Sequence, residues 1–108
     1  MKNNSFLLKD ILPDFSKELV LLLNHKNESI LAKQIDKLEI KSICNCKEDF
    51  CSTFFTSDLK DDLKNFAQTV DLSPENGIVN VDVIDNKIVS IEVLYREEIK
   101  NKLISVFS

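Results

Sequence analysis

The segment GIVNVDVIDNKIVSIEVLY, residues 77–95, decides the fold because it contains two successive stretches in which apolar and polar side chains alternate. An alternation with a period of two predicts an antiparallel hairpin that has one face on a core and the other in water. The turn is expected at Asp85, Asn86 and Lys87, because aspartate and asparagine accept tight turns. The core face is predicted to carry Val79, Val81, Val83, Val89, Ile91, Val93 and Tyr95, and the water face Asn80, Asp82, Ser90, Glu92 and Leu94.

The composition is that of a folded protein. The chain has 108 residues, of which 44% are hydrophobic and 30% charged, which predicts a single domain over residues 1–108. The longest apolar run, residues 19–23, is far below the roughly 20 residues that a membrane span needs. The apolar part of the N-terminal segment is also too short for a secretory signal. We therefore expect a cytoplasmic protein without a membrane partner.

The charge of the chain argues against nucleic acid as a direct partner. The net charge is −4, and an acidic surface repels phosphate backbones. Arginine, the preferred donor to phosphates and base edges, occurs only at Arg96. Gly77 is the only glycine, which excludes the glycine-rich loops that hold phosphates in nucleotide-binding proteins.

The rest of the chain predicts helices before the hairpin and one helix after it. Residues 5–12 suit a short helix that Pro13 halts, and Pro13 suits the first turn of a second helix that ends at residues 24–27. A further helix is expected over residues 28–34 and a closing one over residues 96–107. Strands are expected over residues 40–46, 50–56 and 68–72, while residues 57–65 fit a helix or a charged loop.

This order of elements predicts an α+β fold. We expect two N-terminal helices, with the short one before them, then an antiparallel β-meander of about five strands and a C-terminal helix. The helices are expected on one face of the sheet, which leaves the other face to solvent or to a partner.

Cys44, Cys46 and Cys51 form the tightest cluster of reactive side chains. Zinc accepts thiolate ligands, but a closed site needs four ligands, and the spacing is not that of zinc knuckles or ribbons. Small buried hydrophobes on a strand are the preferred interpretation, and a reducing cytoplasm disfavours a Cys46–Cys51 disulfide. We expect no metal and no cofactor.

No catalytic arrangement stands out from the sequence. His25 is the only histidine, and its place near a predicted helix end favours a capping role over that of a base beside a thiol or serine. Carboxylates are abundant, but no spacing selects one pair for acid–base chemistry. The sequence therefore predicts that the protein is not an enzyme, with an enzyme that acts through paired carboxylates as the third possibility.

Acidic side chains on and near the water face are the remaining candidate site. The predicted partner-binding residues are Asp61, Asp62, Asp71, Asp82, Asp85 and Glu92. Like charges on neighbouring strands destabilise a sheet, and a basic protein partner would compensate them. The alternative is a solvated face that is charged for solubility. An exposed Tyr95 or Phe54 would be a candidate for an apolar anchor in such an interface.

Two parts of the chain are similar to a group of small bacterial proteins. They are residues 38–55, with CNC at 44–46 and CSTF at 51–54, and the hairpin strands IVNVDV at 78–83 and KIVSIEVL at 87–94. Leading helices, a cysteine-bearing hairpin and a final hydrophobic hairpin with a helix resemble immunity proteins of contact-dependent growth inhibition and related polymorphic toxin systems. The resemblance carries over a role but no site.

The resemblance implies a cytoplasmic protein that binds the toxin domain encoded beside it and blocks the active site of that toxin. Such toxins are often nucleases, whose basic surfaces would complement an acidic chain. The leading hypothesis is therefore a non-enzymatic inhibitor that acts as a monomer in a one-to-one complex. The alternative is a small regulatory or scaffold module, with or without a structural metal at the cysteine hairpin.

Overall fold

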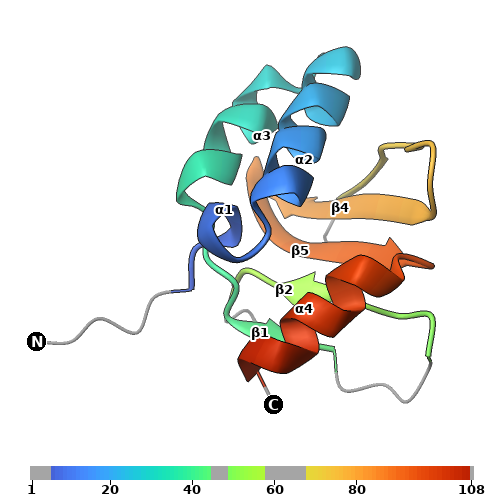
Figure 1. Ribbon diagram of the computed structural model, residues 1–108. Coiled ribbons are helices and arrows are strands. Elements are labelled where there is room, and N and C mark those ends of the chain that lie inside the picture. Colours follow the sequence, from blue (N-terminus) through green and yellow to red (C-terminus); the bar gives the residue numbers. More distant parts are fainter. Residues whose placement is uncertain (1–5, 45–48, 58–67, 108) are drawn as a thin grey trace, which may run out of the picture.

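The computed structural model describes residues 6–44, 49–57 and 68–107, and within these ranges it is an α+β fold with the helices on one face of an antiparallel sheet (Figure 1). The helices are α1 (Leu8–Ile11), α2 (Pro13–His25), α3 (Ser29–Gln34) and α4 (Glu97–Phe107), and the 3-10 turn η1 (Ile35–Lys37) follows α3. The strands are β1 (Ser42–Ile43), β2 (Phe54–Phe55), β3 (Gln68–Asp71), β4 (Ile78–Ile84) and β5 (Lys87–Leu94). The predicted fold class is confirmed. Asp61 and Asp62 lie outside the described residues.

The N-terminal helices begin and end close to the predicted positions. Pro13 is in the first turn of α2, where its missing N–H is not needed, and Asn27 takes a φ of 63° just beyond the end of the helix. The helix predicted over residues 5–12 is shorter, because the chain before α1 is extended. Leu7 pairs with Glu39 as an antiparallel bridge, and the N–H of Leu8 donates to the carbonyl of Leu38 at 2.8 Å. Within the described residues, no helix is both long and apolar enough to cross a bilayer.

The sheet is antiparallel throughout, but it is not the simple meander that the sequence predicted. Its strand order is β1-β2-β5-β4-β3, so that β2 pairs with β5 and β3 lies at the far edge. Strands β1 and β2 are only two residues long, although single backbone hydrogen bonds such as Cys44 N–H to the Thr53 carbonyl extend their pairing. Because β2 pairs with the long strand β5, its backbone hydrogen-bonding groups have a partner on that side. This pairing joins segments that are distant in sequence, so the alternation of residues within one strand does not predict it.

The hairpin of β4 and β5 contains a bulge that shifts the predicted phase only at the start of its second strand. Asp82 lies opposite Ser90 and Val83 opposite Ile88, which leaves Val89 as the extra residue. The core position predicted for Val89 is therefore occupied by Ile88, and Val89 is half-buried. The turn itself has two residues, Asp85 and Asn86, both with positive φ, which is the geometry that matches the twist of a hairpin.

The core lies between the inner face of the sheet and the helices. Val79, Val81, Ile91 and Val93 are fully buried there, as predicted. Phe54 is also fully buried, with its ring edge-on to that of Phe15 on α2 at a centroid distance of 6.4 Å. The buried apolar side chains form one cluster, which includes Leu19 and Leu23 of α2 and Ile99 and Leu103 of α4.

Arg96, the only arginine, joins three parts of the fold. Its Nη1 and Nη2 donate to Glu18 of α2 at 3.0 and 2.8 Å, and its Nε donates to Glu98 of α4 at 2.7 Å. Nη1 also donates to the Asn76 carbonyl, and the guanidinium lies 5.6 Å from the centre of the Phe15 ring. The hydrogen bond to Glu18 is the largest cause that raises the pKa of Arg96 above its ordinary value, and burial of the side chain opposes it.

Because Gly77 has no side chain, the side chain of Arg96 can lie directly against its backbone. Its φ is +73°, and a Cβ there would lie 2.5 Å from the Leu94 carbonyl oxygen and 2.9 Å from Arg96 Cγ. The chain therefore uses its one glycine where a left-handed backbone and a close approach occur together.

Candidate functional site

The outer face of the sheet brings together three of the predicted acidic residues. On β4, Asp82 lies opposite Thr69 of β3 and Ser90 of β5. Two residues earlier on the same strand, Asn80 lies opposite Asp71 and Glu92. Asp82 is therefore the diagonal neighbour of both other carboxylates, at roughly 7–8 Å by the ordinary geometry of such pairs. We call Asp71, Asp82 and Glu92 the acidic face.

Neutral donors on neighbouring strands orient the carboxylates of the acidic face. Asp82 accepts the Thr69 hydroxyl at 2.7 Å on one oxygen and the Ser90 hydroxyl at 2.8 Å on the other. Glu92 accepts the side-chain amide of Asn80 at 2.8 Å. These hydrogen bonds fix the side chains of Asp82 and Glu92 without neutralising their charge. Ser90 is buried although it lies on the outer side, since it sits in the ladder between Asp82 and Phe55.

Asp71 has a structural function as well as a place on the acidic face. Its Oδ1 accepts both the backbone N–H and the hydroxyl of Ser73, at 3.0 and 3.2 Å. Ser73 has a φ of 48°, so this carboxylate stabilises the unusual turn that follows β3. Of the three carboxylates, Asp71 is therefore the one that the turn itself explains, without any need for a binding protein.

Asp85 is separate from the acidic face. It is exposed in the hairpin turn with a φ of 52°, a conformation that aspartate tolerates better than most residues. Gln34 of α3 holds this end of the hairpin, because its amide donates to the Asn86 carbonyl and its Oε1 accepts the N–H of Ile88. The structure thus confirms the predicted turn position of Asp85 and separates this residue from the other acidic residues predicted to bind a partner.

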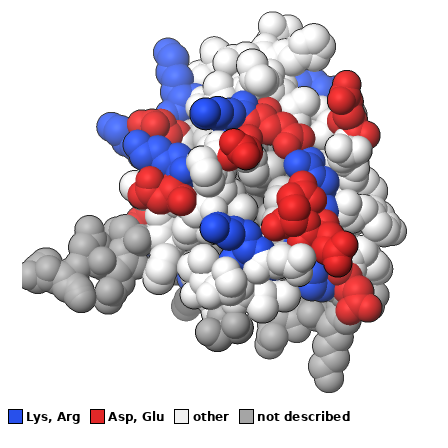
Figure 2. Space-filling view, in the orientation of Figure 1, with Lys and Arg blue, Asp and Glu red and all other residues white. Residues whose placement is uncertain are grey.

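The charge of the acidic face contrasts with that of the helix-bearing face. Across residues 6–44, 49–57 and 68–107, no ion pair involves Asp71, Asp82 or Glu92. Figure 2 shows the opposite side of the molecule, where acidic and basic side chains are interspersed. The ion pair of Lys9 with Asp36 joins α1 to η1. Each pair of diagonal carboxylates repels by on the order of 1 kcal/mol near a surface. A cationic partner would relieve this repulsion.

An exposed pair of aromatic residues, Tyr95 and Phe50, lies beyond the end of β5. The sequence pointed to Tyr95 as a candidate anchor but not to Phe50. Tyr95, predicted on the core face, is 62% exposed because its φ of 64° turns the chain out of the strand towards α4. Its ring stacks on that of Phe50, which is 39% exposed, at a centroid distance of 5.1 Å. Of the two suspected apolar anchors, Tyr95 is therefore exposed and Phe54 is buried. Phe50 had no signal in the sequence beyond its aromatic character.

The two described cysteines do not form a metal centre by themselves. Cys44 and Cys51 are half-buried, and the Sγ of Cys51 lies 3.5 Å from the Thr53 hydroxyl. The described part of the chain contains no group of three histidine, cysteine, aspartate or glutamate side chains placed to hold a metal ion. Cys46 falls outside the described residues. His25 is the last residue of α2, as predicted.

Comparisons of the chain with protein-family models, with curated proteins and with solved structures give no significant match.

Proposed function

We propose that the protein is an immunity protein: a non-enzymatic inhibitor that binds a basic bacterial toxin domain, of the nuclease kind, and covers its active site. The proposal includes a cytoplasmic location and a one-to-one complex. The observation that carries it is the acidic face, on which Asp82 and Glu92 are held outward by neutral hydrogen-bond donors and have no described cation beside them.

Oriented carboxylates suit the recognition of a basic surface. A binding partner that supplies lysine or arginine finds acceptors whose side-chain freedom has already been lost, so association costs less entropy. Like charges on a surface also steer an oppositely charged partner and raise the association rate. This effect weakens with salt, because the Debye length is about 8 Å at physiological ionic strength.

The aromatic pair supplies the apolar component that tight complexes need. The rings of Tyr95 and Phe50 stack on each other and are exposed to solvent, and aromatic side chains are enriched among the residues that dominate binding at the centres of protein interfaces. Tyr95 lies three residues after Glu92 on the same stretch of chain, so the pair adjoins the end of β5 that carries Glu92. The acidic face would then govern the association rate and the aromatic pair the dissociation rate.

A co-expression experiment tests the proposal. The C-terminal domain of the protein encoded immediately upstream is expressed alone and together with this chain, and growth and complex formation are recorded. We expect toxicity that this chain relieves, together with a one-to-one complex of nanomolar affinity, which corresponds to about −12 kcal/mol. A toxic domain that is neither bound nor neutralised would contradict the pairing.

Three variants then locate the interface. Asp82→Asn with Glu92→Gln removes two charges and retains acceptor oxygens, and we expect about a tenfold slower association at low salt. Tyr95→Ala is expected to raise the dissociation rate by on the order of thirtyfold, as for a hot-spot residue. The matched control, Asp10→Asn with Asp14→Asn, removes two exposed charges from the helix side and should leave binding unchanged. Equal effects of the two double variants would refute the acidic face as the binding surface.

A further inference from the structure

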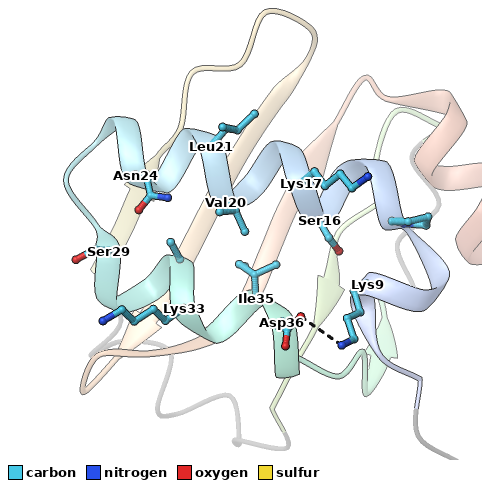
Figure 3. Close-up of a pocket in the computed structure, with 12 residues that line it drawn as sticks. Lys9, Ser16, Lys17, Val20, Leu21, Asn24, Ser29, Lys33, Ile35 and Asp36 are labelled. Atoms are coloured by element: carbon cyan, nitrogen blue, oxygen red, sulfur yellow. Dashed lines mark hydrogen bonds and ion pairs between the residues drawn. The ribbon is translucent and has the colours of Figure 1, made fainter.

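A groove runs between α2 and α3 on the helix side of the molecule, away from the acidic face (Figure 3). It encloses about 790 Å³, which lies within the usual range for pockets that hold small organic molecules. Its apolar lining consists of Pro13, Val20, Leu21, Ala32 and Ile35. Strands β3, β4 and β5 contribute no residue to it, so the groove is independent of the proposed toxin-binding surface.

A buried hydroxyl in the groove has no partner. Ser16 is 6% exposed, and its Oγ is buried without a hydrogen bond. Figure 3 shows this side chain pointing from α2 towards the part of the groove where Lys9 and Asp36 lie. Buried polar groups in native proteins are nearly always satisfied, so an unpaired hydroxyl that lines a cavity indicates a missing acceptor or donor.

The charges at this end of the groove favour an anion. Lys17, next to Ser16 on α2, is exposed, and no ion pair to it occurs in residues 6–44, 49–57 and 68–107. Lys9 lies nearby and is paired with Asp36 at 3.2 Å. The carboxylate of a ligand bound beside these residues would accept hydrogen bonds from the Ser16 hydroxyl and from the Lys17 ammonium. Such hydrogen bonds are charge-assisted and therefore stronger than those between neutral groups.

The remainder of the groove is aliphatic. Val20 and Leu21 follow Lys17 along α2, and Ala32 and Ile35 line the groove from α3 and η1. Leu21 is 71% exposed, which is a large apolar surface to leave in water. An unbranched hydrocarbon chain of moderate length would cover these side chains while its polar end remains at Ser16.

We propose that this groove binds a small amphipathic anion, an aliphatic carboxylate, with its carboxylate at Ser16 and Lys17 and its hydrocarbon tail over Val20, Leu21 and Ala32. The ligand is recognised by an unpaired hydroxyl and a cation at one end and by an apolar wall along the rest. Binding of such a ligand is a property separate from toxin neutralisation, so failure of either proposal leaves the other unaffected.

Titration of the complete ¹⁵N-labelled chain with decanoate, below its micellar concentration, tests the proposal. We expect saturable shifts of the amides of α2 and α3, submillimolar affinity, and at least tenfold weaker binding of decylamine and of acetate. Decylamine retains the tail with the opposite charge, and acetate retains the carboxylate without the tail. Equal binding of decanoate and decylamine, or no binding at millimolar decanoate, would overturn the proposal.

Variants of the head-group end provide a second readout. Ser16→Ala and Lys17→Met should each weaken decanoate binding about fivefold, whereas Lys102→Met, an exposed lysine of α4, should not. Ser16→Ala should also unfold at the same or a higher temperature than the parent without ligand, because it removes an unsatisfied polar group. Unchanged decanoate affinity in Ser16→Ala and Lys17→Met would overturn the assignment of the head group. Binding of an acidic amphipathic helical peptide in the groove, without binding of decanoate, would do so in favour of a protein occupant.

Discussion

Replacement of Arg96 by methionine is expected to be among the most destabilising single changes outside the apolar core. The side chain of Arg96 is 10% exposed, that of Glu18 is 30% exposed and that of Glu98 is 65% exposed. Removing one partner of a fully buried ion pair costs about 3–5 kcal/mol, whereas exposed pairs contribute about 0–1 kcal/mol. The two-pronged Arg96–Glu18 pair lies between these limits, and the Arg96–Glu98 pair belongs to the exposed class.

We therefore expect Arg96→Met to lower the free energy of unfolding by about 3 kcal/mol, including the hydrogen bond to the Asn76 carbonyl and the contact with the Phe15 ring. This loss corresponds to a decrease in melting temperature on the order of 10–20 °C for a domain of this size. Arg96→Lys retains the charge but not the forked geometry and should recover less than half of the loss.

Double-mutant cycles in urea, followed by far-UV circular dichroism, separate the two ion pairs. Arg96→Met combined with Glu18→Gln should give a coupling energy of about 2 kcal/mol, and the same change combined with Glu98→Gln less than about 1 kcal/mol. A coupling to Glu18 no larger than that to Glu98 would refute the conclusion that burial sets the strength of this network.

Three further predictions concern the same fold. Gly77→Ala should destabilise the protein by more than about 1 kcal/mol in urea unfolding, because a Cβ there requires a positive φ and meets a carbonyl oxygen at 2.5 Å; a smaller loss would mean that this turn relaxes freely. Leu19→Ala, at a fully buried position of α2, should lower the free energy of unfolding by about 2–5 kcal/mol. Leu21→Ala, at an exposed position of the same helix, should lower it by less than about 0.5 kcal/mol. Similar losses in the two variants would contradict the orientation of this helix. The hydrogen bond from Arg96 lowers the pKa of Glu98 below its ordinary value of 4.5, so the stabilisation from Glu98 is present above that pH and is lost as the pH falls through the folded pKa. Glu98→Gln should therefore make stability less dependent on pH below 4.5, and an unchanged dependence in chemical unfolding would contradict this assignment.

The sequence alone identified the candidate acidic face more fully than the apolar anchors. Asp71, Asp82 and Glu92 lie on the outer side because side chains alternate along any strand, which is a local property. The exposure of Tyr95 depends on a left-handed backbone after β5, and its stacking on Phe50 depends on a contact across 45 residues. Neither of these can be read from alternation.

What the sequence determined by itself follows from short-range chemistry. Pro13 set the start of α2, Asp85 and Asn86 set the hairpin turn, and the period of two set the inner and outer faces of β4. Each of these depends on the conformational preferences of a few adjacent residues.

Only the tertiary structure decided how these parts combine. It placed β2 beside β5 and introduced the bulge that moved Ile88 into the core position expected for Val89. It also joined Arg96 to Glu18 across 78 residues and formed the groove that contains Ser16. These features arise from contacts between segments that are distant in sequence, and their stability depends on mutual packing and burial that no local pattern encodes.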